Sequence, residues 1–273
     1  MKVIIVPTDF SANARNAMNY ATDLALSVNA SIVLLHVCQL PASEIPVSGE
    51  LLNQWVADAQ KEFDKLKAAI VERTNPRVKV YDEVRTGFLI AELQDYCDKL
   101  KPYAVVMGTQ GAGAVERFVF GSSTIAAMKH LDWPLMIIPP DARFQQIRKI
   151  GLACDMKKVV KTIPINEIKS LVKEFGASLV VIHVNTDDDD KYGPAIVDQS
   201  SLLQEMLDEL HPTYRFVEGG DIEKNLEEVV KQGDVDLLIV VPKKHNVINR
   251  IFHKSQSKQI AMHTHVPLMS LHE

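Results

Sequence analysis

One internal repeat constrains the fold of this chain more than any other feature of its sequence. Residues 1–37 give a short apolar strand, a loop, a helix and a second strand, and residues 148–184 give the same order. Asp9 and Asp155 follow the first strand of each copy, and His36 and His183 come near the end of the second strand. Further along, identical residues recur at a constant offset: Gly87 and Gly220, Arg117 and Arg250, Ser122 and Ser255, Pro134 and Pro267. The chain is therefore expected to contain two copies of one domain.

The spacing of apolar runs indicates the fold of each copy. In the first copy, β-branched runs at 3–6, 32–37, 78–84, 104–107 and 135–138 alternate with helical stretches. Near-continuous apolar strands separated by helices are typical of a parallel sheet covered on both faces. The fold class is predicted to be α/β, with two tandem doubly wound domains, each a five-stranded parallel sheet flanked by about four helices. Pro139 and Pro140 end the last strand of the first copy, which places the domains at 1–143 and 144–273.

The longest predicted helix runs from about residue 50 to residue 73. Its large apolar residues recur at intervals of three and four, which predicts one buried stripe along the helix: Trp55, Ala59, Phe63, Leu66 and Ile70. The counterpart in the second copy, near 201–210, is much shorter.

Composition excludes several classes of protein. Hydrophobic residues make up 47% of the 273 residues, charged residues 24%, and the formal net charge is −5, with both signs mixed along the chain. A nucleic-acid surface would need a basic stripe, so no nucleic-acid partner is expected. The chain contains no run of 18 apolar residues and begins without the long apolar segment of a signal peptide. Three distant cysteines without a CxxC pair indicate reduced thiols, and the expected location is the cytoplasm, away from membranes.

The residues that follow the first and fourth strands are the candidate ligand-binding residues. In a doubly wound sheet, ligands bind beyond the carboxyl ends of the strands, where the strand order reverses. Gly108 and Gly111 would let the backbone adopt positive φ and turn its N–H groups toward an anion. After Gly121, the residues Ser122, Ser123 and Thr124 would add hydroxyl groups to the free N–H groups of a helix N-terminus. Together these segments would hold an oligophosphate.

Each of these residues also has a purely structural interpretation. A glycine after a strand commonly forms a turn, and a serine or threonine at a helix start commonly caps it. The sequence contains no GxxxxGK[ST], and the glycines at 111 and 113 follow the wrong strand for a dinucleotide fingerprint and lack its third glycine. The site is therefore neither a P-loop nor a Rossmann fingerprint.

The spacing of the glycines resembles that of the universal stress protein family in its tandem two-domain form. Nucleotide-binding members carry Gly-x2-Gly-x9-Gly-[Ser/Thr] after the fourth strand, and this chain has Gly108, Gly111, Gly121 and Ser122 at that spacing. The opening IIVPTDFS and the later WPLMII are also similar to the first and fifth strands of that family.

The resemblance implies an ATP site in the first domain. Pro7, Thr8 and Asp9 would flank the adenosine, and Val37 would contact the adenine. Met107 and Gly108 would lie under the ribose, and Gln110 and Gly111 would face the phosphates. Gly121, Ser122, Ser123 and Thr124 would close around the phosphate tail, together with a divalent cation such as Mg²⁺. For Arg117, phosphate contact and a structural role both stay open, because its match to Arg250 in the other copy favours the structural role.

The second copy departs from the pattern. Val241, Lys244 and Lys254 stand where the three glycines would be, and only Ser255 is kept. A β-branched valine and two lysines resist positive φ, so no ATP site of the usual geometry is expected there, although the lysines leave binding of another anion open. The histidines at 253, 263 and 265 lack a carboxylate or cysteine partner at ligand spacing, and no metal site is predicted.

Three functions are compatible with these residues. The first is a cytoplasmic stress-response regulator whose first domain binds ATP or another adenine nucleotide and whose protein partner is unknown. The second is a nucleotide-independent scaffold, and the third is a slow ATPase. No nucleophile with an adjacent base stands out, so the chain is expected not to be an enzyme beyond weak ATP hydrolysis. The fifth strands of the two copies are expected to pair as an intramolecular pseudo-dimer, and further assembly into a homodimer stays open.

Overall fold

The computed structural model describes residues 1–39, 48–109, 121–154, 156, 159–184, 194–217, 228–232, 235–241 and 266–272. The chain divides into two compact units, Met1–Phe144 and Gln145–Glu273. This division falls one residue beyond the boundary expected from the sequence.

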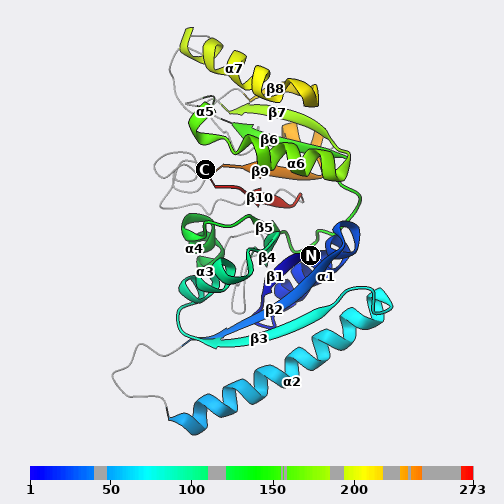
Figure 1. The fold of residues 1–273 in the computed structure, drawn as a ribbon, viewed down its shortest axis with the longest axis vertical. Helices are drawn as coiled ribbons and strands as arrows, with labels where there is room; N and C mark the ends of the chain where they lie inside the picture. Colours follow the sequence, from blue (N-terminus) through cyan, green and yellow to red (C-terminus); the bar gives the residue numbers. More distant parts are fainter. Residues whose placement is uncertain are drawn as a thin grey trace. The chain divides into compact units, whose positions relative to one another are not determined.

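The first unit is an open parallel sheet with strand order β3-β2-β1-β4-β5 (Figure 1). Its elements alternate along the chain: β1 Lys2–Pro7, α1 Ala12–Val28, β2 Ala30–Cys38, α2 Gly49–Thr74, β3 Val80–Thr86, α3 Leu89–Leu100, β4 Ala104–Gly108, α4 Ser122–His130 and β5 Leu135–Ile138. The expected doubly wound fold is confirmed in this unit, whose described residues form five parallel strands and four helices. The third strand begins two residues later than the sequence indicated, because Asn75, with a left-handed backbone, ends α2 and the chain turns before Val80.

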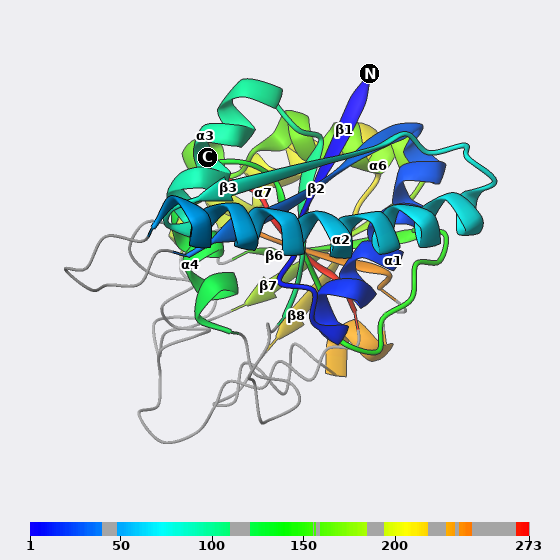
Figure 2. The same ribbon diagram turned by 90° about the horizontal axis from the view of Figure 1, so that it is seen from below.

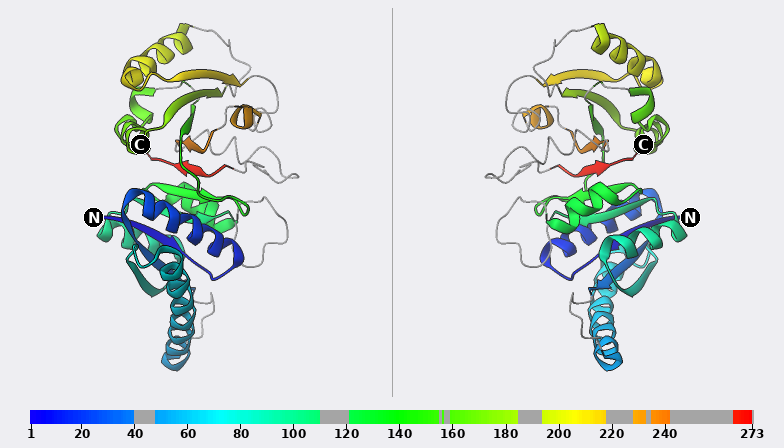
Figure 3. Two further views of the ribbon diagram at one scale, coloured as in Figure 1. Left: turned by 90° about the vertical axis from the view of Figure 1, so that its right-hand side faces the viewer. Right: turned by 90° about the vertical axis from the view of Figure 1, so that its left-hand side faces the viewer.

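Two helices cover each face of this sheet. Parallel crossover connections are right-handed, so α1 and α2 fall on one face and α3 and α4 on the other. The contacts agree, since α1 packs against α2 and α3 packs against α4. The first helix lies over β1 and β4 (Figure 3), and the long α2 runs across β2 and β3 (Figure 2).

The apolar stripe of α2 is buried as expected, with one exception. Ala59, Phe63, Leu66 and Ile70 are buried, whereas Trp55 is only half-buried. The prediction of burial was therefore wrong for Trp55, which lines an open cavity at the end of β2 and not the core.

A polar contact also fixes α2 on β3. The Nζ atom of Lys67 lies 2.7 Å from Oδ1 of Asp82, and the amide of Gln60 donates to the other carboxylate oxygen at 3.1 Å. Partial burial acts to raise the pKa of Asp82, but the hydrogen bonds from Lys67 and Gln60 outweigh it, and the pKa lies below its ordinary value.

The carboxylate of Asp82 should therefore stabilise the first unit in a pH-dependent way. A depressed folded-state pKa gives stability that is present above the unfolded value of about 3.9 and is lost as the pH falls through the folded pKa. We expect Asp82→Asn to lower the free energy of unfolding by about 1 kcal/mol at pH 7. In urea titrations this difference should stay constant down to about pH 4 and shrink only below it. A difference that already shrinks above pH 5 would contradict the assignment, and Asp132→Asn, at an exposed position after α4, serves as the control.

The second unit repeats the same architecture with strand order β10-β9-β6-β7-β8. Its described elements are β6 Lys149–Cys154, α5 Val159–Thr162, α6 Ile165–Phe175, β7 Ser178–Val184, α7 Pro194–Leu207, the 3₁₀ helix Asp208–Leu210, β8 Thr213–Val217, β9 Leu237–Val240 and β10 Leu268–Ser270 (Figure 1). Backbone hydrogen bonds recur at matching positions. Val105 N donates to Pro134 O at 2.8 Å, and Leu238 N donates to Pro267 O at 3.0 Å. The internal repeat is therefore present in the structure as well as in the sequence.

All three cysteines are buried thiols. Burial raises the pKa of Cys38, and burial together with the charge of Asp98 raises the pKa of Cys97 to about 12. Within the described part of the chain, no helix combines the length and the apolar character needed to cross a membrane.

Candidate functional site

The candidate site lies at the carboxyl ends of β1 and β4, which are neighbours in the first sheet. The chain leaves β1 toward β2 and leaves β4 toward β5, so the two connections diverge from adjacent strands. A crevice for a ligand opens at such a point in doubly wound sheets. The topology therefore places the two predicted segments, 7–9 and 107–109, side by side.

The loop after β1 is fixed by a chain of hydrogen bonds. Thr8 is buried, its N–H donates to Leu35 O at 2.8 Å, and its hydroxyl oxygen accepts from Phe10 N at 3.0 Å. The exposed Asp9 accepts from Ser11 N at 3.0 Å through Oδ1. Ser11 then caps α1 by accepting from Ala14 N at 3.2 Å. One carboxylate is thus held at the carboxyl end of β1 on a backbone that these hydrogen bonds fix.

Phe10 has a backbone conformation that is rare for a large side chain. Its φ of 63° is in the left-handed region, where a bulky residue is strained by about 1–2 kcal/mol. The aromatic ring packs on His36 with centroids 4.7 Å apart and on Phe63 at 5.5 Å. The imidazole of His36 contacts Thr8 O at 2.8 Å through Nδ1.

The second unit keeps this turn although its sequence differs. Met156 matches Phe10 and has φ 51°, and its N–H lies 3.3 Å from the Cys154 sulfur in place of the Thr8 hydroxyl. Met156, however, is 2% exposed, whereas Phe10 is half-buried. The turn is therefore common to both copies, and the accessible aromatic ring belongs to the first.

Gly108, at the end of β4, is required for a reason that the sequence did not reveal. A Cβ atom at this position would lie 3.0 Å from Asn13 O and 3.2 Å from Asn13 C, so α1 can approach β4 only over a glycine. Positive φ was expected here and is not found, because Gly108 continues the extended backbone of β4 and pairs with Ile138. The expectation of a left-handed Gly108 was therefore wrong.

The N-terminus of α4 lies against the end of β4. The hydroxyl of Thr124 donates to Gly108 O at 3.0 Å, and Gly121 N donates to Thr109 O at 2.7 Å. Gly121 is the N-cap residue, with φ −65° and ψ 156°, and no side chain caps the helix among the described residues. Ser11 and Ser48, by contrast, cap α1 and α2. The first turn of α4 thus presents backbone N–H groups for which no described side chain is the capping acceptor, a natural place for an anion.

The predicted site residues fall into three groups. Pro7, Thr8, Val37, Met107 and Thr124 are buried; Asp9 and Ser122 are exposed; and Gly108, Gly121 and Ser123 are partly exposed. Gln110, Gly111 and Arg117 lie outside the described residues, as do Asp155, Lys244 and Lys254 of the second copy. The described members of the set are brought together at one edge of the sheet.

Two residues that shape the candidate site were not predicted from the sequence. Asn13 belongs to no motif, because it acts through its backbone carbonyl, which packs closely against Gly108. Phe10 is part of the PTDFS run, but only the left-handed φ reveals that its ring turns toward His36.

An open parallel sheet whose connections diverge between β1 and β4 defines a doubly wound α/β domain, and comparisons with known proteins identify its family. The sequence model of the universal stress protein family matches residues 1–139, about half of the chain, and the chain belongs to that family.

Relatives agree with this assignment. Universal stress protein MJ0531 of Methanocaldococcus jannaschii is 26% identical over 140 residues, which cover 50% of this chain and 81% of the relative. The crystal structure of a universal stress protein from Archaeoglobus fulgidus aligns over 99% of this chain and 98% of its own, with a TM-score of 0.74 and 18% identity. A functionally unknown protein, PA1789 from Pseudomonas aeruginosa, covers 100% of this chain and 92% of its own, with a TM-score of 0.57 and 10% identity. The tandem arrangement of the fold therefore extends along the whole chain.

Proposed function

We propose that this chain is a stress-response regulator that binds ATP at the edge of its first domain. The observation that carries the proposal is the first turn of α4, which begins at a glycine and lacks a side-chain cap among the described residues. The same turn is tied to the end of β4 through Thr124 and Gly108. Backbone N–H groups and the helix dipole at this place favour a phosphate.

The remaining predicted residues suit an adenosine. Asp9 is exposed beside the switch point, where its carboxylate accepts hydrogen bonds from a ribose hydroxyl or an adenine amino group. Val37 and Met107 are buried at the ends of their strands and offer apolar surface to the base and the ribose. Gln110 and Gly111 complete the phosphate side of this proposal.

A divalent cation would be held mainly by the nucleotide. Among the described residues, no group of three histidine, cysteine or acidic side chains is placed to bind a metal. Mg²⁺ commonly binds through substrate phosphates and water with only one or two protein ligands, so the residues present are compatible with Mg²⁺ bound to ATP.

Binding, and not catalysis, is the proposed activity. The nucleotide would alter contacts with a protein partner by favouring one of two states of the first domain. A nucleotide-independent scaffold is the alternative, and the uncapped α4 favours the binding function over it. A slow ATPase would need a base beside the phosphates, and no residue is proposed for that role.

Calorimetric titration of nucleotide-free protein with ATP and Mg²⁺ tests the proposal. One site per chain is expected, with the second domain silent. Two sites would mean that the lysine-bearing loop of the second copy also binds ATP. If calorimetry gives no heat and equilibrium dialysis detects no bound ATP, the scaffold function is favoured.

Gly121→Asp separates binding from folding. The N-cap backbone is extended, so aspartate fits it without strain, and aspartate is a good cap. We expect stability to be unchanged or raised by a few tenths of a kcal/mol, because the carboxylate caps α4. ATP affinity should fall at least tenfold, because the same carboxylate repels phosphate from these N–H groups. Gly121→Ser is the uncharged control. If Gly121→Asp binds ATP as tightly as the natural protein, the phosphate does not lie at α4.

A further inference from the structure

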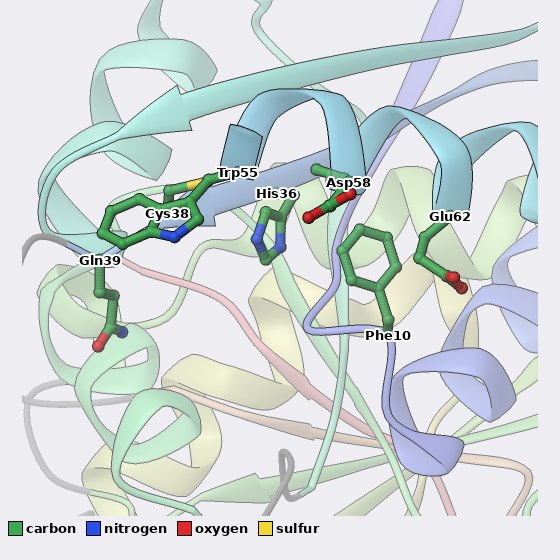
Figure 4. A pocket seen from close by; sticks show the side chains of 8 residues that line it. Phe10, His36, Cys38, Gln39, Trp55, Asp58 and Glu62 are labelled. Carbon is green, nitrogen blue, oxygen red and sulfur yellow. The ribbon is translucent and has the colours of Figure 1, made fainter. Parts of the chain in front are cut away.

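A cavity of about 340 Å³ lies between the end of β2, the loop after β1 and the first half of α2. It is lined by Phe10, His36, Cys38, Gln39, Trp55, Asp58, Ala59 and Glu62. Figure 4 shows the Trp55 indole beside Cys38 at one end, the Phe10 ring and Glu62 at the other, and His36 and Asp58 between them. The volume is at the lower end of the range of small-molecule sites.

This cavity is separate from the proposed ATP site. Successive residues of a strand point to opposite faces, so His36 and Cys38 face α2, whereas Val37 faces the other side of the sheet. Among the described residues, the two sites share the loop after β1, in which Thr8 contacts His36 and Phe10. A ligand under α2 would therefore not occupy the place proposed for adenine.

The polar groups of the cavity are mainly acceptors. A carbonyl oxygen cannot donate, so the 2.8 Å contact with Thr8 O places the proton of a neutral His36 on Nδ1 and leaves Nε2 as an acceptor. Asp58 and Glu62 add two carboxylates one helical turn apart, and the described residues that line the cavity include no lysine or arginine. Hydrogen bonds from Gln54 and Lys61 keep the pKa of Asp58 below its ordinary value, so this carboxylate is charged at neutral pH.

The salt bridges of these carboxylates do not neutralise the cavity. Lys61 lies 3.0 Å from Asp58, and Lys65 lies 2.5 Å from Glu62, but both lysine side chains are 69% exposed. Exposed ion pairs contribute little to stability, so a ligand can replace them at small cost.

The aromatic side chains supply the other half of a recognition site. Trp55 stands at the start of the apolar stripe of α2 and is half-buried at the cavity, and Phe10 keeps its ring there in spite of a left-handed φ. Aromatic faces beside carboxylates attract cations through the ring quadrupole as well as by charge.

We propose that this cavity binds a small organic cation with an aromatic body and a primary ammonium group. The aromatic body packs against Trp55 at one end of the cavity (Figure 4). The ammonium group lies toward the Phe10 ring, donates to His36 Nε2 and Asp58, and is attracted by the charge of Glu62. The proposal does not depend on ATP binding.

The two tryptophans of the chain allow a direct test with phenethylamine as the probe. Trp55 lines the cavity, whereas Trp133 donates its indole N–H to Asp98 at 2.8 Å and is not among the residues that line it. In ¹H–¹⁵N spectra of the full chain, phenethylamine should shift the Trp55 indole signal in a saturable way and leave the Trp133 signal in place. Trp133→Phe assigns the two signals.

The charge requirement is tested with a matched ligand and matched variants. Phenylpropionate has a similar body and a negative charge, and it should bind at least tenfold more weakly. Asp58→Asn combined with Glu62→Gln should weaken phenethylamine binding at least fivefold, whereas Asp64→Asn on the same helix should not.

A Trp55 signal that does not move, equal binding of phenylpropionate, or an unchanged affinity in the double variant would each overturn the proposal. Saturation of the protein with ATP should leave phenethylamine binding in place, and competition between the two would place the amine in the nucleotide site.

Discussion

Phe63→Ala should lower the free energy of unfolding of the first unit by about 3–5 kcal/mol, the range for removing a large buried aromatic side chain. Phe63 is 0% exposed on the buried face of α2, and its ring contacts Phe10. The substitution removes the transfer free energy of the ring and leaves a cavity that the packed helix and sheet cannot fully close. This is a large fraction of the stability of an ordinary domain.

Urea unfolding followed by tryptophan fluorescence measures this effect without interference from the second unit. Both tryptophans, Trp55 and Trp133, belong to Met1–Phe144. Val71→Ala, on the same helix with a side chain 44% exposed, should cost less than about 1 kcal/mol. Similar losses in the two variants would mean that α2 does not pack on the sheet through the face described above.

Gly108→Val should both destabilise the first unit and weaken ATP binding. A Cβ at this position meets the backbone of Asn13 at 3.0 Å, and a backbone atom cannot rotate away as a side chain does. We expect a loss of about 2–3 kcal/mol, because the first turn of α1 must move away from β4. The loop that carries Asp9 enters this turn, so ATP affinity should fall at least tenfold even where the variant is folded.

A second glycine provides the control for Gly108. A Cβ at Gly49, at the start of α2, would meet nothing within 4 Å, so Gly49→Ala should leave both stability and ATP binding nearly unchanged. Calorimetry with ATP and urea unfolding of the two variants give the comparison. If Gly108→Val keeps full stability, α1 and β4 are not in the close contact described, and if it keeps full ATP affinity, the β1 loop is not part of the site.

Much of the fold was predictable because its signals are local. Buried parallel strands must be continuously apolar, and so the strands at 104–107 and 135–138 were found within one residue of their observed ends. The repeat predicted two domains of one fold, and the recurrence of the left-handed turn at Phe10 and Met156 agrees with it in geometry. The candidate site was predicted in part for the same reason, since strand ends and glycine spacing can be read without knowing any distant contact.

Contacts between distant segments were not predictable. Trp55 has the helical spacing of a core residue, and only the position of α2 over β2 shows that it borders a cavity. The sequence predicted that Gly108 is a glycine because it needs a positive φ. The structure shows that it is a glycine because the backbone of Asn13 leaves no room for a Cβ atom. Likewise the tautomer of His36 depends on a carbonyl 28 residues away in the chain.

The sequence by itself determined the number of domains and the parallel α/β architecture, and its resemblance to a known family implied the candidate nucleotide residues. The domains and the architecture depend on periodicity along the chain, which the backbone hydrogen bonds of helices and strands convert directly into structure. The tertiary structure decided why Gly108 must be a glycine, that α4 begins without a side-chain cap among the described residues, and that Phe10, Trp55 and two carboxylates meet at a cavity under α2. These features depend on which surfaces come within a few ångströms of one another, and packing, unlike periodicity, is a property of the folded chain as a whole.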